Sequence, residues 1–339
     1  MAGLLFMGGL KGMSNAESMP QVVIVSPALR DANNGNWQTA RRWRQHLAPL
    51  FPTRIVKRWP DADAGRDRVM IALHARRSAD AIAAWSAAHP GRCLAVVLTG
   101  TDLYRDIQTD AAARRSLALA QRLVVLQECA SDALPAEVHG KSRVIFQSTA
   151  TRQTLVKSPH RLRVLMVGHL REEKSPETLF AAARLLAQRH DIYIDHIGEA
   201  LDPALGAAAR ATMAAAPNYR WLGGLPHEAV RRRIQRAHLL IHASRLEGGA
   251  HVIMEAVASG TPVLASHIPG NIGMLGADYA GYFPWGDAAA LAALILRCQN
   301  DGHLLETLAA QCRARAPLFE PAAERSALRR LVDELLETR

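Results

Sequence analysis

Short runs of valine, isoleucine and leucine alternate along the chain with longer stretches rich in alanine, leucine and arginine. The apolar runs are continuous and do not alternate with polar residues, which indicates strands buried on both faces. This pattern is typical of an α/β protein with parallel sheets. Strands are predicted at 22–27, 69–75, 94–100, 123–128, 144–149, 163–169, 192–198, 239–244 and 262–266.

A polar segment at 151–160, which carries a proline, separates the first five predicted strands from the last four. We therefore expect two Rossmann-like domains that face each other across a cleft. The first would span 20–155 and the second 156–316, after a flexible N-terminal extension at 1–19. The amphipathic segment at 317–339 is expected to form a C-terminal helix.

The 339 residues are 49% hydrophobic and 21% charged, a composition typical of globular proteins. The longest apolar run, at 288–296, is about half the length that a membrane-spanning helix needs. The opening residues lack a positively charged start and place Lys11 after their apolar part, so a signal peptide is not expected. Four cysteines lie far apart without a CxxC pair, which favours a reducing, cytoplasmic location over a disulfide framework.

The net charge of +10 is concentrated in the first half of the chain. Residues 1–159 hold 21 lysines and arginines against 12 acids, whereas residues 160–339 hold 20 against 19. A basic half can serve solubility alone, or it can form one wall of a cleft that attracts a small anion. Nucleic acid is not expected as a partner, because no dense basic run is interleaved with aromatics and only 5% of residues are aromatic.

The segment 245–266 carries the strongest chemical signal, because Glu247 and Glu255 are separated by seven residues that begin with a run of small ones. Small residues at a helix start let a phosphate approach free backbone N–H groups, and the helix dipole favours its negative charge. Eight helical residues span about 12 Å. One carboxylate could then meet a sugar and the other a ribose, with a diphosphate between them. An amphipathic helix with a solvated glutamate at each end fits the same pattern.

A second loop follows the predicted strand at 163–169 and carries His169, Arg171 and Lys174 ahead of a helix. Lys174 is the only lysine after Lys157. A cation here can neutralise a departing diphosphate without a metal ion, although a solvated loop lysine is the plainer interpretation. Together the two loops predict a nucleotide-sugar site.

These residues resemble the donor domain of GT-B-fold glycosyltransferases, specifically glycosyltransferase family 4. The matching parts run from Gly168 to Lys174, from His196 to Glu199 and from Glu247 to Val263. The likeness extends over about 20–315. It implies a GT-B fold, in which the C-terminal helix typically crosses back to the first domain.

The resemblance also implies what the donor-side residues do. Lys174 would grip the donor diphosphate, Glu255 would hold the ribose hydroxyls and Glu247 would lie beside the sugar, which makes Lys174 and Glu247 the catalytic candidates. Two positions depart from the family pattern: His169 replaces the usual arginine, which leaves Arg171 as a substitute, and Gly-Gly-Ala replaces Gly-Phe-Gly. The donor-binding candidates are His169, Arg171, Lys174, Glu247, Gly248, Gly249, Ala250, His251 and Glu255.

Two loops of the first half are candidates for the acceptor side. The segment 26–47 combines an asparagine-rich turn, whose glycine lets the backbone approach a ligand, with nearby arginines. The segment 98–106 follows a buried strand and has Thr99 where family 4 enzymes often carry a histidine. His74, in a neighbouring loop, could face the cleft or be a neutral loop histidine. The acceptor-binding candidates are Arg30, Asn34, Gly35, Asn36, Thr99, Gly100, Thr101 and Asp102.

Four first-half segments, 26–43, 72–79, 98–107 and 123–127, resemble a narrower family 4-like branch, the selenosugar synthases of selenoneine biosynthesis. That resemblance implies transfer of a sugar (GlcNAc, or glucose) from a UDP-sugar to selenophosphate, giving a 1-seleno sugar, UDP and phosphate. Selenium in selenophosphate is already anionic and polarisable, so it needs placement more than deprotonation. UDP-sugar and selenophosphate would be the small-molecule substrates, with no further cofactor.

Other functions fit part of the pattern. An ordinary family 4-like glycosyltransferase would act on a hydroxyl of a sugar, lipid or small molecule, and a UDP-sugar epimerase would need acid and base carboxylates but no acceptor loop. A nucleotide-sugar-binding module without catalysis would not need the lysine. Metal is not expected, because Asp61 and Asp63 form an Asp-x-Asp pattern in a turn-rich stretch with no strand before it, and the 14 histidines show no ligand spacing.

Overall fold

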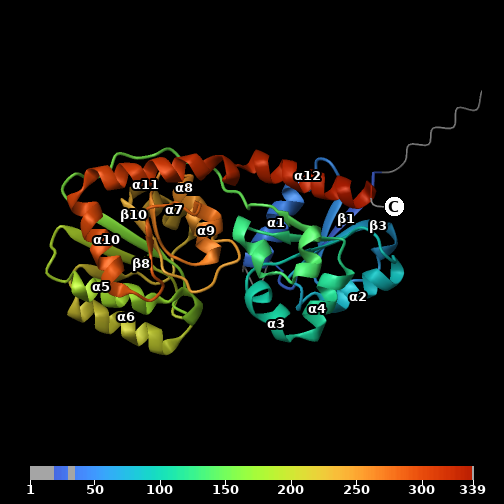
Figure 1. Ribbon diagram of the computed structural model, residues 1–339, viewed down its shortest axis with the longest axis horizontal. Coiled ribbons are helices and arrows are strands. Elements are labelled where there is room, and N and C mark those ends of the chain that lie inside the picture. The colour runs from blue at the N-terminus through green and yellow to red at the C-terminus, as the bar shows by residue number, and fades with distance from the viewer. Residues whose placement is uncertain (1–18, 30–34, 338–339) are drawn as a thin grey trace, which may run out of the picture.

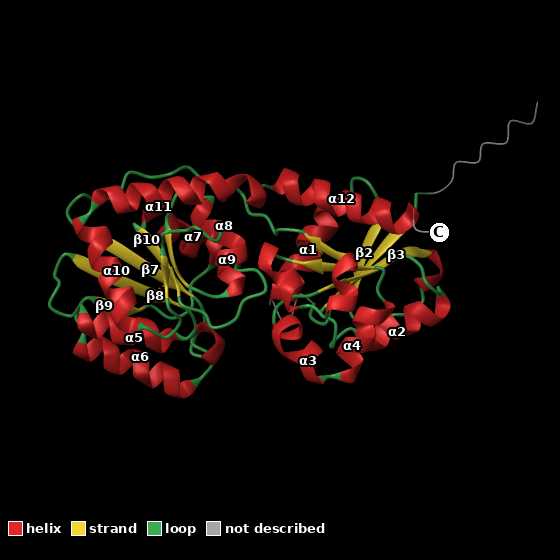
Figure 2. Ribbon diagram, in the orientation of Figure 1, coloured by secondary structure: helices red, strands yellow, loops and turns green. Residues whose placement is uncertain are grey.

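The computed structural model describes residues 19–29 and 35–337 of the chain. Within them the chain forms two α/β halves, each built on a parallel sheet of six strands (Figures 1 and 2). The predicted α/β class is therefore confirmed. The expected extension at 1–19 lies almost entirely outside the described residues, and so do the acceptor candidates Arg30 and Asn34.

The first sheet consists of β1 (Gln21–Val25), β2 (Thr53–Val56), β3 (Asp67–Leu73), β4 (Leu94–Val97), β5 (Arg122–Val125) and β6 (Ser142–Val144). Its strand order is β2-β1-β3-β4-β5-β6, and all neighbours are parallel. Nearly every residue of β1, β3, β4 and β5 is buried, as the continuous apolar runs predict.

The second sheet consists of β7 (Leu162–Val167), β8 (Ile192–Ile197), β9 (Tyr219–Trp221), β10 (Leu239–His242), β11 (Val263–Ser266) and β12 (Tyr282–Phe283). Its order is β12-β11-β10-β7-β8-β9, again with parallel neighbours. This is the strand order of dinucleotide-binding Rossmann folds. Residues 145–161, which hold no helix or strand, connect the two sheets.

Helices cover the sheets of both halves, and in the second half α5, α6 and α10 pack together while α7, α8, α9 and α11 lie across the sheet from them (Figure 1). No helix among the described residues is long and apolar enough to cross a membrane. The helices are α1 (Gly35–Leu47), α2 (Ala79–Ala88), α3 (Ile107–Thr109), α4 (Ala111–Leu119), α5 (Pro176–Leu185), α6 (Pro203–Ala215), α7 (His227–Arg236), α8 (His251–Val257), α9 (Pro269–Leu275), α10 (Ala288–Asn300), α11 (Gly302–Arg315) and α12 (Pro321–Glu337).

The C-terminal helix α12 returns from the second half to pack on the first, as the GT-B resemblance implies (Figure 1). Its apolar face joins the core that α1 and the first sheet form. At the start of α12, the buried carboxylate of Glu324 accepts hydrogen bonds from Nε1 of Trp43 at 2.6 Å, Nε of Arg42 at 2.9 Å and the backbone N–H of Ser148 at 2.9 Å. The crossing is therefore fixed by both apolar packing and a buried polar network.

Candidate functional site

The carboxyl ends of β7 and β10 place two loops side by side in the second sheet. These strands are hydrogen-bonded neighbours at the centre of the sheet. The next strand after β7, which is β8, lies toward one edge of the sheet, whereas the next strand after β10, which is β11, lies toward the other edge. Open parallel sheets bind ligands outside such a point of reversal. The loops span 168–175 and 243–250, and they contain most of the predicted donor-binding residues.

Lys174 and Glu247 meet across these two loops. The Nζ atom of Lys174 donates a hydrogen bond of 2.5 Å to Oε1 of Glu247, and both side chains are largely buried. Burial alone would raise the pKa of Glu247, but the charge of Lys174 and a hydrogen bond from His242 outweigh it and hold the pKa well below its usual range. Glu247 is therefore an ionised carboxylate that holds Lys174 in place.

His242, the last residue of β10, is a site residue that the sequence does not single out. Its ring is buried, and its Nε2 atom lies 3.3 Å from Oε1 of Glu247. Its Nδ1 atom has no hydrogen-bond partner among the described residues. The only signal in the sequence is a histidine that ends an apolar strand just before the Glu247 loop.

A second carboxylate cluster surrounds Glu255 on α8. Its Oε1 atom lies 2.6 Å from Nε2 of His227, 3.4 Å from Nδ1 of His251 and 3.6 Å from Nη1 of Arg231. Burial acts to raise the pKa of Glu255, but the hydrogen bonds from His227 and His251 outweigh it and lower the pKa to about 2. The same bond raises the pKa of His227, whose side chain is 73% exposed. His227 and Arg231 were not predicted as site residues.

The helix between the two carboxylates is shorter than its sequence suggests. The small residues Gly248, Gly249 and Ala250 precede it as loop, and α8 begins only at His251. Gly260, with a φ of +67°, ends the following turn in the left-handed conformation that glycine favours. The backbone amides of Gly249, Ala250 and His251, three of the donor-binding candidates, thus lie at and just before the helix start.

Gly248 and Gly249 lie against the first half of the chain. A Cβ atom on Gly248 would be 2.5 Å from the carbonyl oxygen of Thr99, and one on Gly249 would be 2.8 Å from Cβ of Leu126. Gly100, with a φ of +136°, faces Gly248 from the other side. Glycine is therefore required here for close approach, and the donor candidates lie beside the acceptor candidates Thr99 and Gly100.

His169 and Arg171, the two remaining candidates of the first donor loop, are not directed at Glu247. The Nδ1 atom of His169 accepts a hydrogen bond of 3.1 Å from the backbone N–H of Glu199. Arg171 is half exposed and lies 3.9 Å from Glu173. In the described part of the chain, the groups paired with Glu247 are the ammonium of Lys174 and the imidazole of His242.

The loop after β4 is organised by Asp102, which is fully buried. Its carboxylate accepts hydrogen bonds from the backbone N–H groups of Thr99 at 2.8 Å, Gly100 at 3.0 Å and Ala75 at 3.0 Å. Asp102 therefore fixes the backbone of the loop. The side chain of Thr101 in the same loop is half-buried. Gly35 and Asn36 form the first turn of α1.

His74 joins this acceptor-side loop. It follows β3 with a φ of 72°, a left-handed conformation that is costly for a non-glycine residue and frequent at functional sites. Its Nε2 atom lies 3.4 Å from Oγ1 of Thr101 and 3.9 Å from Oδ2 of Asp106. Burial lowers the pKa of His74, although Asp102 and Asp106 oppose that effect. A neutral, buried imidazole beside Thr101 is the result.

The Asp-x-Asp pattern lies away from these loops, before β3. Both carboxylate oxygens of Asp61 accept hydrogen bonds of 2.7 Å from the guanidinium of Arg54. No group of three or more potential metal ligands is clustered within residues 19–29 and 35–337.

The family described as "Glycosyl transferases group 1" matches residues 147–316, half of the chain. Among curated proteins, the "Glycosyltransferase 1 domain-containing protein 1" of Xenopus tropicalis is 24% identical in an alignment of 272 residues that covers 71% of this chain and 77% of that protein. The matched region contains both loops with Lys174 and Glu247, and it also contains α8.

Solved structures share the fold over almost the whole chain. Sucrose-phosphate synthase from Thermosynechococcus elongatus superimposes with a TM-score of 0.74 at 18% identity, covering 95% of this chain and 100% of that one. Anabaena HepE in complex with UDP gives 0.73 at 16% identity over 94% and 100%, and its complex with UDP-glucose gives 0.70 at 16% over 93% and 100%. At these identities the likeness shows the fold, which is that of two facing Rossmann-like halves.

Proposed function

The chain belongs to the family of group 1 glycosyl transferases, and from that premise we propose that it transfers a sugar from a UDP-sugar to selenophosphate. A selenium lone pair attacks the anomeric carbon while the bond from that carbon to the diphosphate oxygen breaks, and its electrons leave with UDP. Water then cleaves the selenium–phosphorus bond, giving phosphate and a 1-seleno sugar. The sugar is GlcNAc, or glucose.

The pairing of Lys174 with Glu247 at the reversal point of the second sheet is the observation that carries the donor side. A departing UDP gains negative charge on its diphosphate, and a fixed cation in a dry crevice stabilises that charge. In the proposed reaction Lys174 faces the diphosphate while Glu247, braced by His242, faces the sugar. HepE, which has the same fold, binds UDP and UDP-glucose.

Glu255 is the proposed ligand of the ribose. It is an ionised carboxylate on the helix that follows the Glu247 loop, and a carboxylate accepts hydrogen bonds from two hydroxyls. His227 occupies one of its oxygens in the free protein. Donor binding would replace this imidazole with ribose hydroxyls.

The acceptor side rests on the contact between Gly100 and Gly248, which brings the loop after β4 to the donor loop. This loop itself carries threonine where the wider family often has a histidine, and the neighbouring imidazole of His74 is buried against Thr101, so the loop presents no exposed histidine base to a hydroxyl acceptor. An anionic selenium needs no base, and its phosphate group suits the basic first half of the chain. The likeness of the first-half segments to selenosugar synthases points to the same acceptor.

UDP release tests this function directly. Purified protein with UDP-GlcNAc, and in parallel with UDP-glucose, is expected to release UDP rapidly only when selenophosphate is present. Inorganic phosphate serves as the matched anion without selenium. Equal rates of UDP release with and without selenophosphate would contradict the proposed acceptor and leave only donor hydrolysis or another acceptor.

A further inference from the structure

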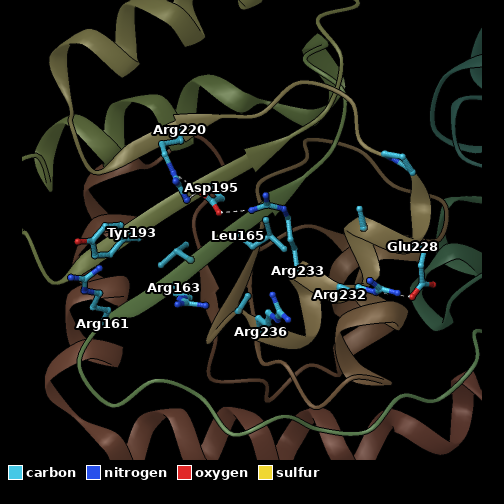
Figure 3. Close-up of a pocket in the computed structure, with 14 residues that line it drawn as sticks. Arg161, Arg163, Leu165, Tyr193, Asp195, Arg220, Glu228, Arg232, Arg233 and Arg236 are labelled. Atoms are coloured by element: carbon cyan, nitrogen blue, oxygen red, sulfur yellow. Dashed lines mark hydrogen bonds and ion pairs between the residues drawn. The ribbon is translucent and has the colours of Figure 1, made fainter.

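One face of the second sheet carries polar side chains where a parallel sheet normally carries apolar ones. Arg163 on β7 pairs in register with Tyr193 on β8, and Asp195 on β8 pairs with Arg220 on β9. The alternate residues of β8 are buried on the opposite face. Between the polar face and α7 lies a pocket of about 720 Å³ (Figure 3).

Arginine dominates the lining of this pocket, against only two carboxylates. Asp195 lies 2.7 Å from Arg220 and 3.1 Å from Arg233, and so holds one arginine from the sheet and one from α7. Glu228 lies 3.3 Å from Arg232 on the same helix. The arginines are Arg161, Arg163, Arg220, Arg232, Arg233 and Arg236.

Three of these arginines have no carboxylate within ion-pair distance in the described residues. Arg161 and Arg163 belong to the β7 side of the pocket and Arg236 to the end of α7, so they approach it from two walls (Figure 3). Arg161 lies over the ring of Tyr193, 5.0 Å from its centroid. Like charges gathered around one cavity repel one another unless an anion lies between them.

We propose that this arginine pocket binds a soluble oligophosphate anion, such as inorganic triphosphate or the triphosphate of a nucleotide. Guanidinium groups bind phosphate oxygens through paired hydrogen bonds, and several unpaired guanidiniums favour a ligand with several charges. The volume is that of a small-molecule site. This site is separate from the donor loops and goes beyond the proposed function.

The walls of the pocket favour a small anion over a membrane or a nucleic acid. None of the exposed large apolar side chains of the described residues lines the pocket, so its walls offer no large exposed apolar group to a bilayer. The lining has a single aromatic ring, that of Tyr193, over which Arg161 lies, so it lacks the series of stacking rings typical of single-stranded nucleic-acid sites.

Calorimetric titration of the full chain with inorganic triphosphate tests the proposal. The double variant Arg163→Ala/Arg236→Ala is expected to bind at least about tenfold more weakly, because two charge-assisted contacts are lost. The control Arg325→Ala/Arg330→Ala removes the same charge from exposed positions on α12 and should bind like the parent chain. Lys174→Ala, which alters the candidate donor site, should retain the triphosphate binding that Arg163→Ala/Arg236→Ala weakens.

Two results would overturn this site. Unchanged affinity in Arg163→Ala/Arg236→Ala, with binding lost in Lys174→Ala, would place the triphosphate at the donor loops. Tighter binding of a single-stranded oligonucleotide than of triphosphate, weakened by the same double variant, would make the pocket a nucleic-acid surface instead.

Discussion

Lys174 is positioned by a neighbour from far along the chain, since Glu247 comes 73 residues later and is itself braced by His242. In the proposed reaction this lysine stabilises the departing diphosphate. Replacing it with alanine should lower turnover by about 100-fold or more, the loss typical of a single group that stabilises developing charge. Steady-state UDP release in the presence of selenophosphate measures the effect.

The matched control for Lys174→Ala is Lys57→Ala, which removes an exposed lysine from the first half. It should leave turnover unchanged. If Lys174→Ala retained the turnover of the control, Lys174 would have no part in the chemistry.

His227 makes donor binding depend on pH. Its pKa is raised by Glu255, so the pair is fully formed at low pH and is lost as the pH rises through that raised value. In the proposed donor complex, ribose hydroxyls would compete with His227 for the same carboxylate oxygen of Glu255. UDP binding is therefore expected to weaken by about fivefold as the pH falls from about 8 to about 5.5.

Calorimetric titration with UDP across this range measures the dependence, and His227→Ala should flatten it while tightening binding at low pH. His190→Ala, at an exposed histidine on the connection between α5 and β8, should keep the slope of the parent chain. A slope that survives in His227→Ala would mean that another group titrates with UDP.

Glu247, Glu255 and Lys174 could be chosen as candidate site residues from the sequence, because each belongs to a short local pattern that follows an apolar strand. His242 and His227 could not, because each acts only through a contact that tertiary structure creates. His242 reads as part of a strand, and His227 reads as the start of a surface helix. Arg171, which the sequence suggested as a substitute for the family's arginine, lies 3.9 Å from the carboxylate of Glu173 instead of pairing with Glu247.

At the scale of elements, continuous apolar runs predicted the central strands of both sheets. The strands β9 and β12 were missed because they have only three and two residues, and β2 was missed because two of its four residues are polar. The run at 144–149 was predicted as a strand, but β6 ends at Val144 and the rest belongs to the connection between the sheets. Strand order, which creates the reversal point, depends on long-range pairing that local patterns do not contain.

The attachment of α12 gives a prediction at this scale. Glu324→Gln should destabilise the folded chain by about 3 kcal/mol, because it removes the charge that pairs with Arg42 in a buried network. Denaturation in urea, followed by tryptophan fluorescence, measures the change. The pKa of Glu324 is lowered in the fold, so its contribution is present above about pH 4.5 and is lost as the pH falls through the lowered value.

The control for this prediction is Glu320→Gln, an exposed glutamate just before the helix, which should change stability little. Equal stability of both variants at neutral pH would mean that apolar packing alone holds α12 in place.

At the scale of the whole molecule, α12 and the contact of Gly100 with Gly248 join a basic half to the half that carries Lys174 and Glu247. The two candidate sites therefore lie at one junction, with the donor loops on one side and the loop after β4 on the other. This arrangement suits direct attack by a small anionic acceptor on a bound UDP-sugar.

Mass spectrometry of the product is the most direct test of that account. Purified protein, UDP-GlcNAc and freshly prepared selenophosphate should yield a hexosamine that carries the isotope pattern of selenium, and the product should be absent without protein. Formation of UDP without any selenium-containing sugar would contradict the account and show that the junction serves a different acceptor.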